Sequence, residues 1–136
     1  MIKAWLHAVR LRTLPLSLSG IIVGTGLAAL IGAFDGLIFS LALLTTIGFQ
    51  VLSNFANDLG DSQKGTDNAQ RVGPARAIQS GQLSAAQMKV GMWVVGGFSL
   101  LSALYLIKLS VPNLTTNAIY FYIILALACI AAAITY

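Results

Sequence analysis

Residues 36–57 read GLIFSLALLTTIGFQVLSNFAN, a run of 22 residues in which no side chain is charged. A helix needs about 20 mostly apolar residues to cross the hydrocarbon core of a bilayer, where its backbone N–H and C=O groups must pair with one another. Three further uncharged runs, at residues 14–33, 90–107 and 109–136, have comparable lengths. We therefore predict an all-α, multi-pass transmembrane helix bundle with about four membrane-spanning helices, placed at about residues 14–33, 36–57, 87–107 and 116–136.

The composition excludes an ordinary soluble domain. Of the 136 residues, 57% are hydrophobic and 9% are charged, whereas soluble domains carry roughly 25% charged residues. The net charge of +4 could suit nucleic acid, but the basic residues flank the apolar runs and alternate with aspartates, so we expect no nucleic-acid partner. The single cysteine, Cys129, excludes an internal disulfide framework and a cysteine-based metal site.

The basic residues predict how the chain is oriented. Three precede the first span and three follow the second, and only Asp35 lies in the turn between these spans; the basic residues are Lys3, Arg10, Arg12, Lys64, Arg71 and Arg76. Lysine and arginine are enriched in cytoplasmic loops, so the N-terminus and residues 58–84 should both be cytoplasmic. Lys108, after the third span, is a mild counter-signal. We expect residues 58–84 to form an aspartate-rich loop, because they combine charges with glycines and a proline.

Local signals mark helix boundaries and contacts. Thr13 is a suitable N-cap for the first span, with Pro15 in its first turn, and Ser84 with Gln87 forms a capping box before the third. The pair Gly20 and Gly24 would allow a close approach between helices.

Polar side chains enter the second span before its apolar run has ended. Five of them are spaced by three or four residues or lie side by side on one helical face: Gln50, Asn54, Asn57, Asp58 and Asp61. An aspartate facing lipid at the middle of a bilayer costs roughly 2.5–3.5 kcal/mol, so this face should line a protein cavity.

The same region combines acids and bases. Carboxylate and amide oxygens, including those of Asp67, suit magnesium, which usually binds through one or two carboxylates together with substrate phosphates. Lys64, Arg71 and Arg76 can contact phosphate as well. A polar helix end followed by a solvated loop would account for any one of these residues, but the combination favours a diphosphate site.

These residues carry a family resemblance. The segment at 54–67, NFANDLGDSQKGTD, followed by RVGPARA at 71–77, resembles the first aspartate-rich motif of the UbiA superfamily of intramembrane prenyltransferases. With RLRTLPLS at 10–17, it is most similar to the 1,4-dihydroxy-2-naphthoate polyprenyltransferase branch. The resemblance implies a bacterial inner-membrane enzyme of menaquinone biosynthesis that transfers a polyprenyl group from polyprenyl diphosphate to an aromatic acid. The acceptor ring loses its carboxylate, and the product is demethylmenaquinone.

The resemblance also implies roles for individual residues. Magnesium would be bound by Asn57, Asp58, Asp61 and Asp67, of which Asp58 and Asp61 are the catalytic acids. The spacing of six between Asp61 and Asp67 is longer than the spacing of four in many members of the superfamily and resembles that of the naphthoate branch. Diphosphate would contact Lys64, Arg71 and Arg76; Gln50 and Asn54 would extend the pocket; and Arg10 or Arg12 would meet the aromatic acid.

Several alternatives remain open at this point. Members of the superfamily have about nine spans and a second aspartate-rich motif, so residues 1–136 would form one incomplete membrane domain, half of a UbiA-type bundle. We expect this piece to be inactive unless a complementary C-terminal half or self-association completes the cavity. Other acceptors, such as 4-hydroxybenzoate or haem, are possible. A small oligomeric ion-coupled transporter would also place acids inside a membrane, and a structural fragment without activity is a further alternative.

Overall fold

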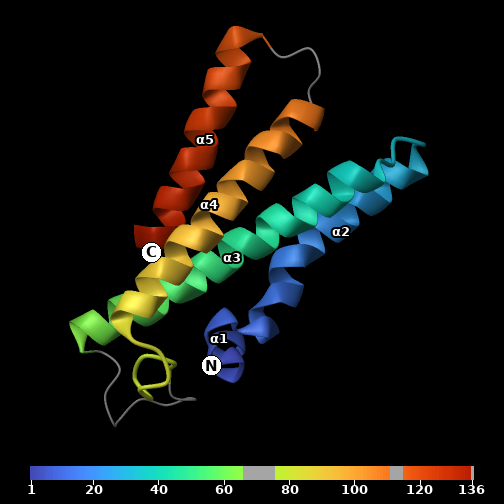
Figure 1. The fold of residues 1–136 in the computed structure, drawn as a ribbon. Helices are drawn as coiled ribbons and strands as arrows, with labels where there is room; N and C mark the ends of the chain where they lie inside the picture. Colours follow the sequence, from blue (N-terminus) through green and yellow to red (C-terminus); the bar gives the residue numbers. More distant parts are fainter. Residues whose placement is uncertain (66–75, 111–114, 136) are drawn as a thin grey trace.

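The computed structural model describes residues 1–65, 76–110 and 115–135, which fold into helices joined by turns (Figure 1). The elements in order are α1 (Ile2–Val9), the 3-10 turn η1 (Leu11–Thr13), α2 (Leu14–Leu30), α3 (Gly36–Lys64), α4 (Ala85–Ser110) and α5 (Thr116–Thr135). Within these ranges, four helical segments are long and apolar enough to cross a membrane. The predicted all-α, multi-pass architecture is confirmed.

The central helix of the fold is α3. It contacts every other helix, with α4 and α5 packed along one side and α1 and α2 along another (Figure 1). Asp35 caps its N-terminus, because the Asp35 carboxylate accepts hydrogen bonds from the N–H groups of Leu37 and Ile38 at 2.8 and 3.0 Å. The predicted polar face, from Gln50 to Asp61, lies toward the C-terminal end of this central helix.

Helix α3 continues beyond the apolar run. We predicted that the loop begins at residue 58, but residues 58–64 are helical and the helix ends only at Gly65. Gly65 has a φ of 68°, the left-handed conformation that glycine adopts readily at the end of a helix. The prediction was wrong for these seven residues because charged residues do not themselves stop a helix, and Lys64 in the last turn suits the helix dipole.

The two predicted helix starts have different outcomes. The capping box of α4 is confirmed: Ser84 N–H donates to Gln87 Oε1 at 2.8 Å, and Gln87 N–H donates to Ser84 Oγ at 3.2 Å. Helix α2 begins after Thr13, as expected, but the Thr13 side chain makes no capping hydrogen bond to the helix. It donates instead to the carbonyl of Arg10 at 2.9 Å, so it holds the turn that precedes the helix.

Close packing of α4 against α3 and α1 depends on particular glycines. A Cβ atom at Gly48 would lie 3.0 Å from Ser99 Cβ, and one at Gly91 would lie 2.6 Å from the indole ring of Trp5. Thr45 of α3 and Ser102 of α4 share a buried hydrogen bond of 2.8 Å. Small residues and buried hydroxyl pairs are typical of contacts between membrane helices.

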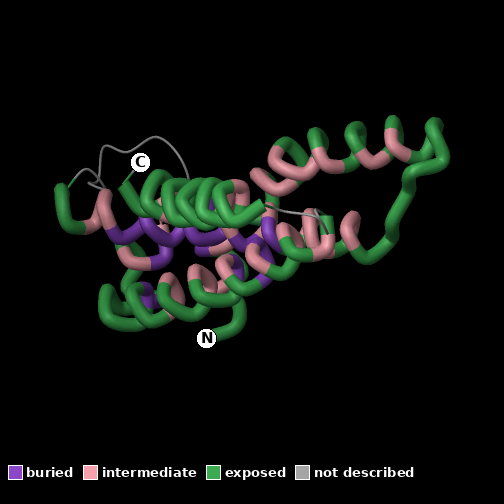
Figure 2. Tube along the Cα trace, turned by 90° about the horizontal axis from the view of Figure 1, so that it is seen from above, coloured by how far each residue is buried: buried purple, intermediate pink, exposed green. Residues whose placement is uncertain are grey.

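The glycine pair in α2 behaves differently. No atom of the described chain lies within 4 Å of a Cβ placed at Gly20 or Gly24, and no residue of α2 is buried. Within the described residues, the expected helix contact at this pair is therefore absent. Figure 2 shows that the buried residues gather along α3 and its neighbours and that the outer faces are exposed.

The contact at Gly48 leads to a first prediction. We expect Gly48→Ala to lower the stability of the fold, because the new methyl group would overlap the buried Ser99 side chain; overpacking of this kind costs about 1–3 kcal/mol. The midpoint of thermal unfolding in detergent should fall. Gly20→Ala is the matched control: it lies in a helix with open space around it and should gain up to about 1 kcal/mol. Equal shifts in the two variants would contradict the packing role of Gly48.

Candidate active site

The polar face of α3 is partly buried against the N-terminal elements. Asn54, which is 3% exposed, donates from Nδ2 to the carbonyl of Val9 at 2.8 Å and to Thr13 Oγ1 at 3.2 Å. Its own Oδ1 accepts from Gln50 Nε2 at 3.4 Å, and Ser17 of α2 donates to Gln50 Oε1. Gln50 and Asn54 therefore attach α1, η1 and α2 to α3, which is a structural role that the sequence did not predict.

Asn54 holds a strained turn. Arg10, which ends α1, has a φ of 54° and a ψ of 59° and is the one non-glycine residue with positive φ in the described ranges. A left-handed conformation costs a non-glycine residue roughly 1–2 kcal/mol, so neighbouring contacts must stabilise it. Two hydrogen bonds do so. Asn54 Nδ2 donates to the carbonyl of Val9, one residue before Arg10, and Thr13 Oγ1 donates to the carbonyl of Arg10 itself.

A second prediction follows from this junction. Asn54→Asp replaces the donating amide by a carboxylate that would face the Val9 carbonyl, so the variant should lose two hydrogen bonds and bury an unpaired charge. We expect a loss of about 2–4 kcal/mol in stability, with faster amide hydrogen exchange in residues 10–13. Gln63→Glu, which adds the same charge to an exposed position of α3, is the control and should change neither measurement. Unchanged exchange in Asn54→Asp would contradict the junction.

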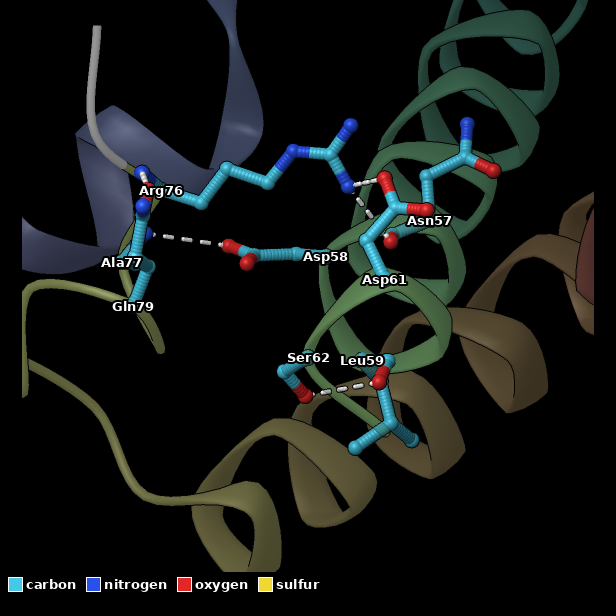
Figure 3. Close-up of polar contacts among 8 residues, drawn as sticks. All are labelled: Asn57, Asp58, Leu59, Asp61, Ser62, Arg76, Ala77 and Gln79. Carbon is cyan, nitrogen blue, oxygen red and sulfur yellow. Dashed lines mark hydrogen bonds and ion pairs between the residues drawn. The ribbon is translucent and has the colours of Figure 1, made fainter. Parts of the chain in front are cut away.

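The first acid on this face, Asp58, is 1% exposed and is held by residues that follow position 75. Its Oδ2 accepts a hydrogen bond of 3.2 Å from the N–H of Ala77 (Figure 3). Within the described part of the chain, its Oδ1 has no hydrogen-bond partner although it is buried. One carboxylate oxygen thus anchors the acid while the other is left as an acceptor in the interior.

Residues 76–83 form a compact turn that presents this N–H group. The N–H groups of Gln82 and Leu83 donate to the carbonyl of Ala77 at 3.0 and 3.1 Å, and Ala77 and Leu83 are 1% and 2% exposed. These two side chains belong to the core cluster that also contains Phe55 of α3. The apolar anchoring of the 76–83 turn therefore fixes the hydrogen-bond donor of Asp58.

Arg76 joins the same turn to two more residues of α3. Its guanidinium nitrogen Nη1 donates to the carbonyl of Asn57 at 2.7 Å and forms an ion pair with Asp61 Oδ2. Figure 3 shows the long arginine side chain reaching across from the turn to α3. Acids and a base that are separated by 15 to 18 residues in the sequence are thus brought together.

Two arginines lie close enough at this site to repel one another. Burial lowers the pKa of the Arg76 guanidinium, the nearby charge of Arg10 lowers it further, and Asp58 acts in the opposite direction. Arginine keeps its charge nonetheless. A pair of neighbouring guanidinium groups favours an added anion, and phosphate is the anion whose geometry arginine matches best.

The other predicted site residues fall into two groups. Lys64, at the last position of α3, and Arg12, in η1, are both exposed. The structure thus distinguishes the two N-terminal arginines, because Arg10 approaches Arg76 and Arg12 points to the surface. Asp67 and Arg71 lie outside the described residues. The Ala77 N–H group was not predicted, since a backbone donor leaves no signal in side-chain spacing.

A family model now adds to this geometry. The model of the UbiA prenyltransferase family matches residues 17–136, which include all of α3, the 76–83 turn, α4 and α5. The chain belongs to the UbiA prenyltransferase family. This membership favours an enzyme over the ion-coupled transporter that the acidic face alone would allow.

Curated relatives agree with the family. The chain is 44% identical to a 1,4-dihydroxy-2-naphthoate octaprenyltransferase of Haemophilus influenzae over 99% of the chain and 44% of that protein. It is 42% identical to the Escherichia coli protein of the same name, over 98% of the chain and 43% of the relative. A Mycobacterium tuberculosis relative with this name is 35% identical over 76% of the chain. The UbiA chain described here thus spans less than half the length of its relatives, and no solved structure matches it.

UbiA prenyltransferases generally depend on a divalent metal, so the donor set can be tested against that chemistry. Asn57, Asp58 and Asp61 supply hard oxygen atoms within two turns of one helix, and the buried Oδ1 of Asp58 is a suitable ligand. Asp61 is paired with Arg76, which a metal ion would have to displace. Among the described residues, no group of three or more histidine, cysteine or acidic side chains is gathered as in a complete protein-only metal site. The residues therefore fit a metal ion that takes some of its ligands from the protein and the others from a bound diphosphate.

Proposed function

We propose that this UbiA protein transfers a polyprenyl group from polyprenyl diphosphate to 1,4-dihydroxy-2-naphthoate, a step of menaquinone biosynthesis. The relatives that match almost the whole chain carry this activity in their names, but the chain spans only 44% and 43% of their lengths. The activity is therefore a proposal for the complete protein. In this proposal, the acidic end of α3 forms one wall of the active site.

One observation carries the proposal: a buried carboxylate oxygen of Asp58 without a hydrogen-bond partner in the described chain lies near two arginines. An unsatisfied buried acceptor is costly, at about 1–3 kcal/mol or more for a charged group. Binding a cation removes that cost, and the arginines then suit the anion that accompanies the cation. A metal-bound diphosphate supplies both charges.

Each described residue has a defined task in this proposal. Asp58 and Asp61, with Asn57 beside them, would hold a magnesium ion, which when bound neutralises charge on the diphosphate leaving group. Arg76 would move its guanidinium from Asp61 to a phosphate oxygen. The hydrogen bond from Ala77 N–H to Oδ2 would hold the Asp58 carboxylate in place. The C–O bond of the donor would break with its electron pair on diphosphate. The allylic carbon would then bond to the ring carbon that carries the carboxylate, which leaves as carbon dioxide, so that the electron pair of the broken bond returns to the ring.

Three further assignments belong to the same proposal. Lys64 at the end of α3, together with Asp67 and Arg71 after it in the sequence, would complete the diphosphate site. Arg10 is better placed than Arg12 to meet the carboxylate of the acceptor, because Arg10 approaches the cluster and Arg12 is exposed. We also propose a bacterial inner-membrane location with a cytoplasmic N-terminus, on the basis of the basic residues around the first two spans.

A third prediction tests the substrates. Membranes that contain the complete protein should convert octaprenyl diphosphate and 1,4-dihydroxy-2-naphthoate to a prenylated product, measured by chromatography of the lipid extract. Chelation of divalent metal should stop product formation, and added magnesium should restore it. Membranes from cells without the protein are the control. Faster conversion of 4-hydroxybenzoate than of the naphthoate would overturn the acceptor assignment, and turnover in excess chelator would overturn the metal.

A further inference from the structure

In the proposed active site, one of the two acids already holds a cation of the chain itself. Arg76 Nη1 forms an ion pair with Asp61 Oδ2 and donates to the carbonyl of Asn57 at 2.7 Å, so the guanidinium lies against the last turns of α3 (Figure 3). The side chain of Arg76 is 13% exposed and that of Asp61 is 31% exposed. Ions in solution can therefore reach Asp61, but the charge of its carboxylate is already balanced.

The other acid is held by a neutral donor. Asp58, one turn earlier on α3, accepts a hydrogen bond from Ala77 N–H at Oδ2, and its Oδ1 is buried and accepts no hydrogen bond from the described residues. A neutral N–H group leaves the charge of a carboxylate in place, whereas a guanidinium balances it. A metal ion that uses both acids would therefore find Asp58 ready and would have to compete with Arg76 for Asp61.

Arg76 can change its partner without disturbing Asp58. The backbone of Arg76 is fixed, because its N–H group donates to Gln79 Oε1 at 3.2 Å and its carbonyl accepts from the N–H of Ser80 at 2.8 Å. The next residue, Ala77, is 1% exposed and supplies the N–H group that holds Asp58. Rotation of the arginine side chain moves the guanidinium and leaves these backbone contacts in place.

The charges around the ion pair favour a metal ion and a diphosphate together over either one alone. Arg10 and Arg76 are close enough to repel one another, and the acids Asp58 and Asp61 balance them. A divalent cation alone would add positive charge beside two guanidinium groups, and a diphosphate alone would add negative charge beside two carboxylates. When both bind, their charges largely cancel, and the negative charge that remains on the diphosphate suits Arg76.

We propose that the ion pair between Arg76 and Asp61 is an autoinhibitory contact, which keeps a divalent metal from the site until a diphosphate arrives. The guanidinium occupies the acid in place of the metal, and a phosphate oxygen offers it a new partner, which releases Asp61 to the metal. The metal and the diphosphate then bind cooperatively, and each raises the affinity for the other by the same factor. The inference rests on the proposed function, because it assigns a regulation to the same site.

Binding of Mn²⁺ to the complete, purified protein tests this contact without prenyl transfer. Equilibrium dialysis measures the Mn²⁺ that the protein retains, with and without inorganic diphosphate. In the parent, Mn²⁺ alone should bind weakly, and diphosphate should raise its affinity by about tenfold, since couplings between two ligands are typically about 5- to 150-fold. Equal affinities with and without diphosphate would overturn the proposal, whether or not any variant folds.

Arg76→Gln removes the guanidinium and keeps a polar side chain. Because the side chain no longer competes for Asp61, Mn²⁺ without diphosphate should bind about tenfold more tightly than it does to the parent. A role of Arg76 limited to holding the 76–83 turn predicts the opposite sign, since a looser turn would weaken the hold on Asp58. Unchanged or weaker binding in the variant, with thermal unfolding that shows it to be folded, would overturn the proposal.

Two further variants locate the effect at Asp61. In an Asp61→Asn background, Arg76→Gln should no longer raise the affinity for Mn²⁺. A rise as large as in the parent would show general charge repulsion and would overturn the proposal. Lys89→Gln is the matched control, because it removes an exposed positive charge from the first turns of α4 and should leave Mn²⁺ binding unchanged.

Failure of this contact can be distinguished from failure of the proposed function. If the parent retains Mn²⁺ with diphosphate but Arg76→Gln does not bind Mn²⁺ more tightly without it, the autoinhibitory contact is wrong and the proposed active site stands. If the parent retains no Mn²⁺ with or without diphosphate, the metal site and the autoinhibitory contact are both wrong.

Discussion

Asp58→Asn is expected to lower the rate of prenyl transfer by about two to three orders of magnitude while the protein still inserts into the membrane and folds. Asparagine has the size of aspartate, and its amide oxygen can still accept the hydrogen bond from Ala77 N–H. What it loses is the negative charge at the buried Oδ1 atom, where a cation would bind. The effect should therefore appear in catalysis and in metal dependence rather than in stability.

The measurement compares initial rates of prenyl transfer over a range of magnesium concentrations in membranes with equal amounts of protein. Asp61→Asn should show the same kind of defect, with the additional loss of the ion pair to Arg76. Asp35→Asn is the matched control, because it removes a charge from the other end of α3 and asparagine caps a helix as well as aspartate does. Full activity in both Asp58→Asn and Asp61→Asn would contradict the proposed site.

Arg76→Ala should have the second large effect, a loss of about a hundredfold to a thousandfold in transfer rate, as when one preorganised donor to a developing charge is removed. The variant also loses the contacts that join the 76–83 turn to Asn57 and Asp61. Arg76→Lys should recover part of the rate, since an ammonium group supplies the charge but not the planar fork of donors.

Kinetics of the complete protein at varied polyprenyl diphosphate concentration distinguish the possible roles of Arg76. Contact with the leaving group predicts a lower kcat, whereas a role limited to holding the turn predicts faster hydrogen exchange in residues 76–83 with kcat unchanged. Arg12→Ala, an exposed arginine outside the cluster, is the control and should retain activity. If Arg76→Ala matched this control, the proposed contact with diphosphate would be wrong.

Much of the fold could be predicted from the sequence because the bilayer imposes simple rules. Charges are so few that the apolar runs stand out, and their lengths are those that helices need. The capping box at Ser84 and Gln87 was predicted correctly because a cap depends only on residues that are close in the chain. The end of α3 was placed too early because residues 58–64 are polar and helical at once.

The candidate site was predicted in its chemistry but not in its construction. Helical spacing is enough to place Asn54, Asp58 and Asp61 on one face. It cannot show that Asn54 binds the turn at Arg10, or that Asp58 is held by a backbone N–H group 19 residues later. Those partners depend on how α1 and the 76–83 turn pack on α3, and packing is decided by tertiary contacts such as those of Ala77 and Leu83.

The partners of the polar face of α3 have an order along the chain that bears on biogenesis. Gln50 and Asn54 are satisfied by residues 9–17, which a ribosome has already released when α3 emerges. Asp58 and Asp61 depend on Arg76 and Ala77, which are synthesised afterwards. The inner part of α3 can therefore enter the bilayer with its amides already paired. Its acidic end can gain these contacts only after residues 76 and 77 have been synthesised, so the site is one of the last parts of this segment to form.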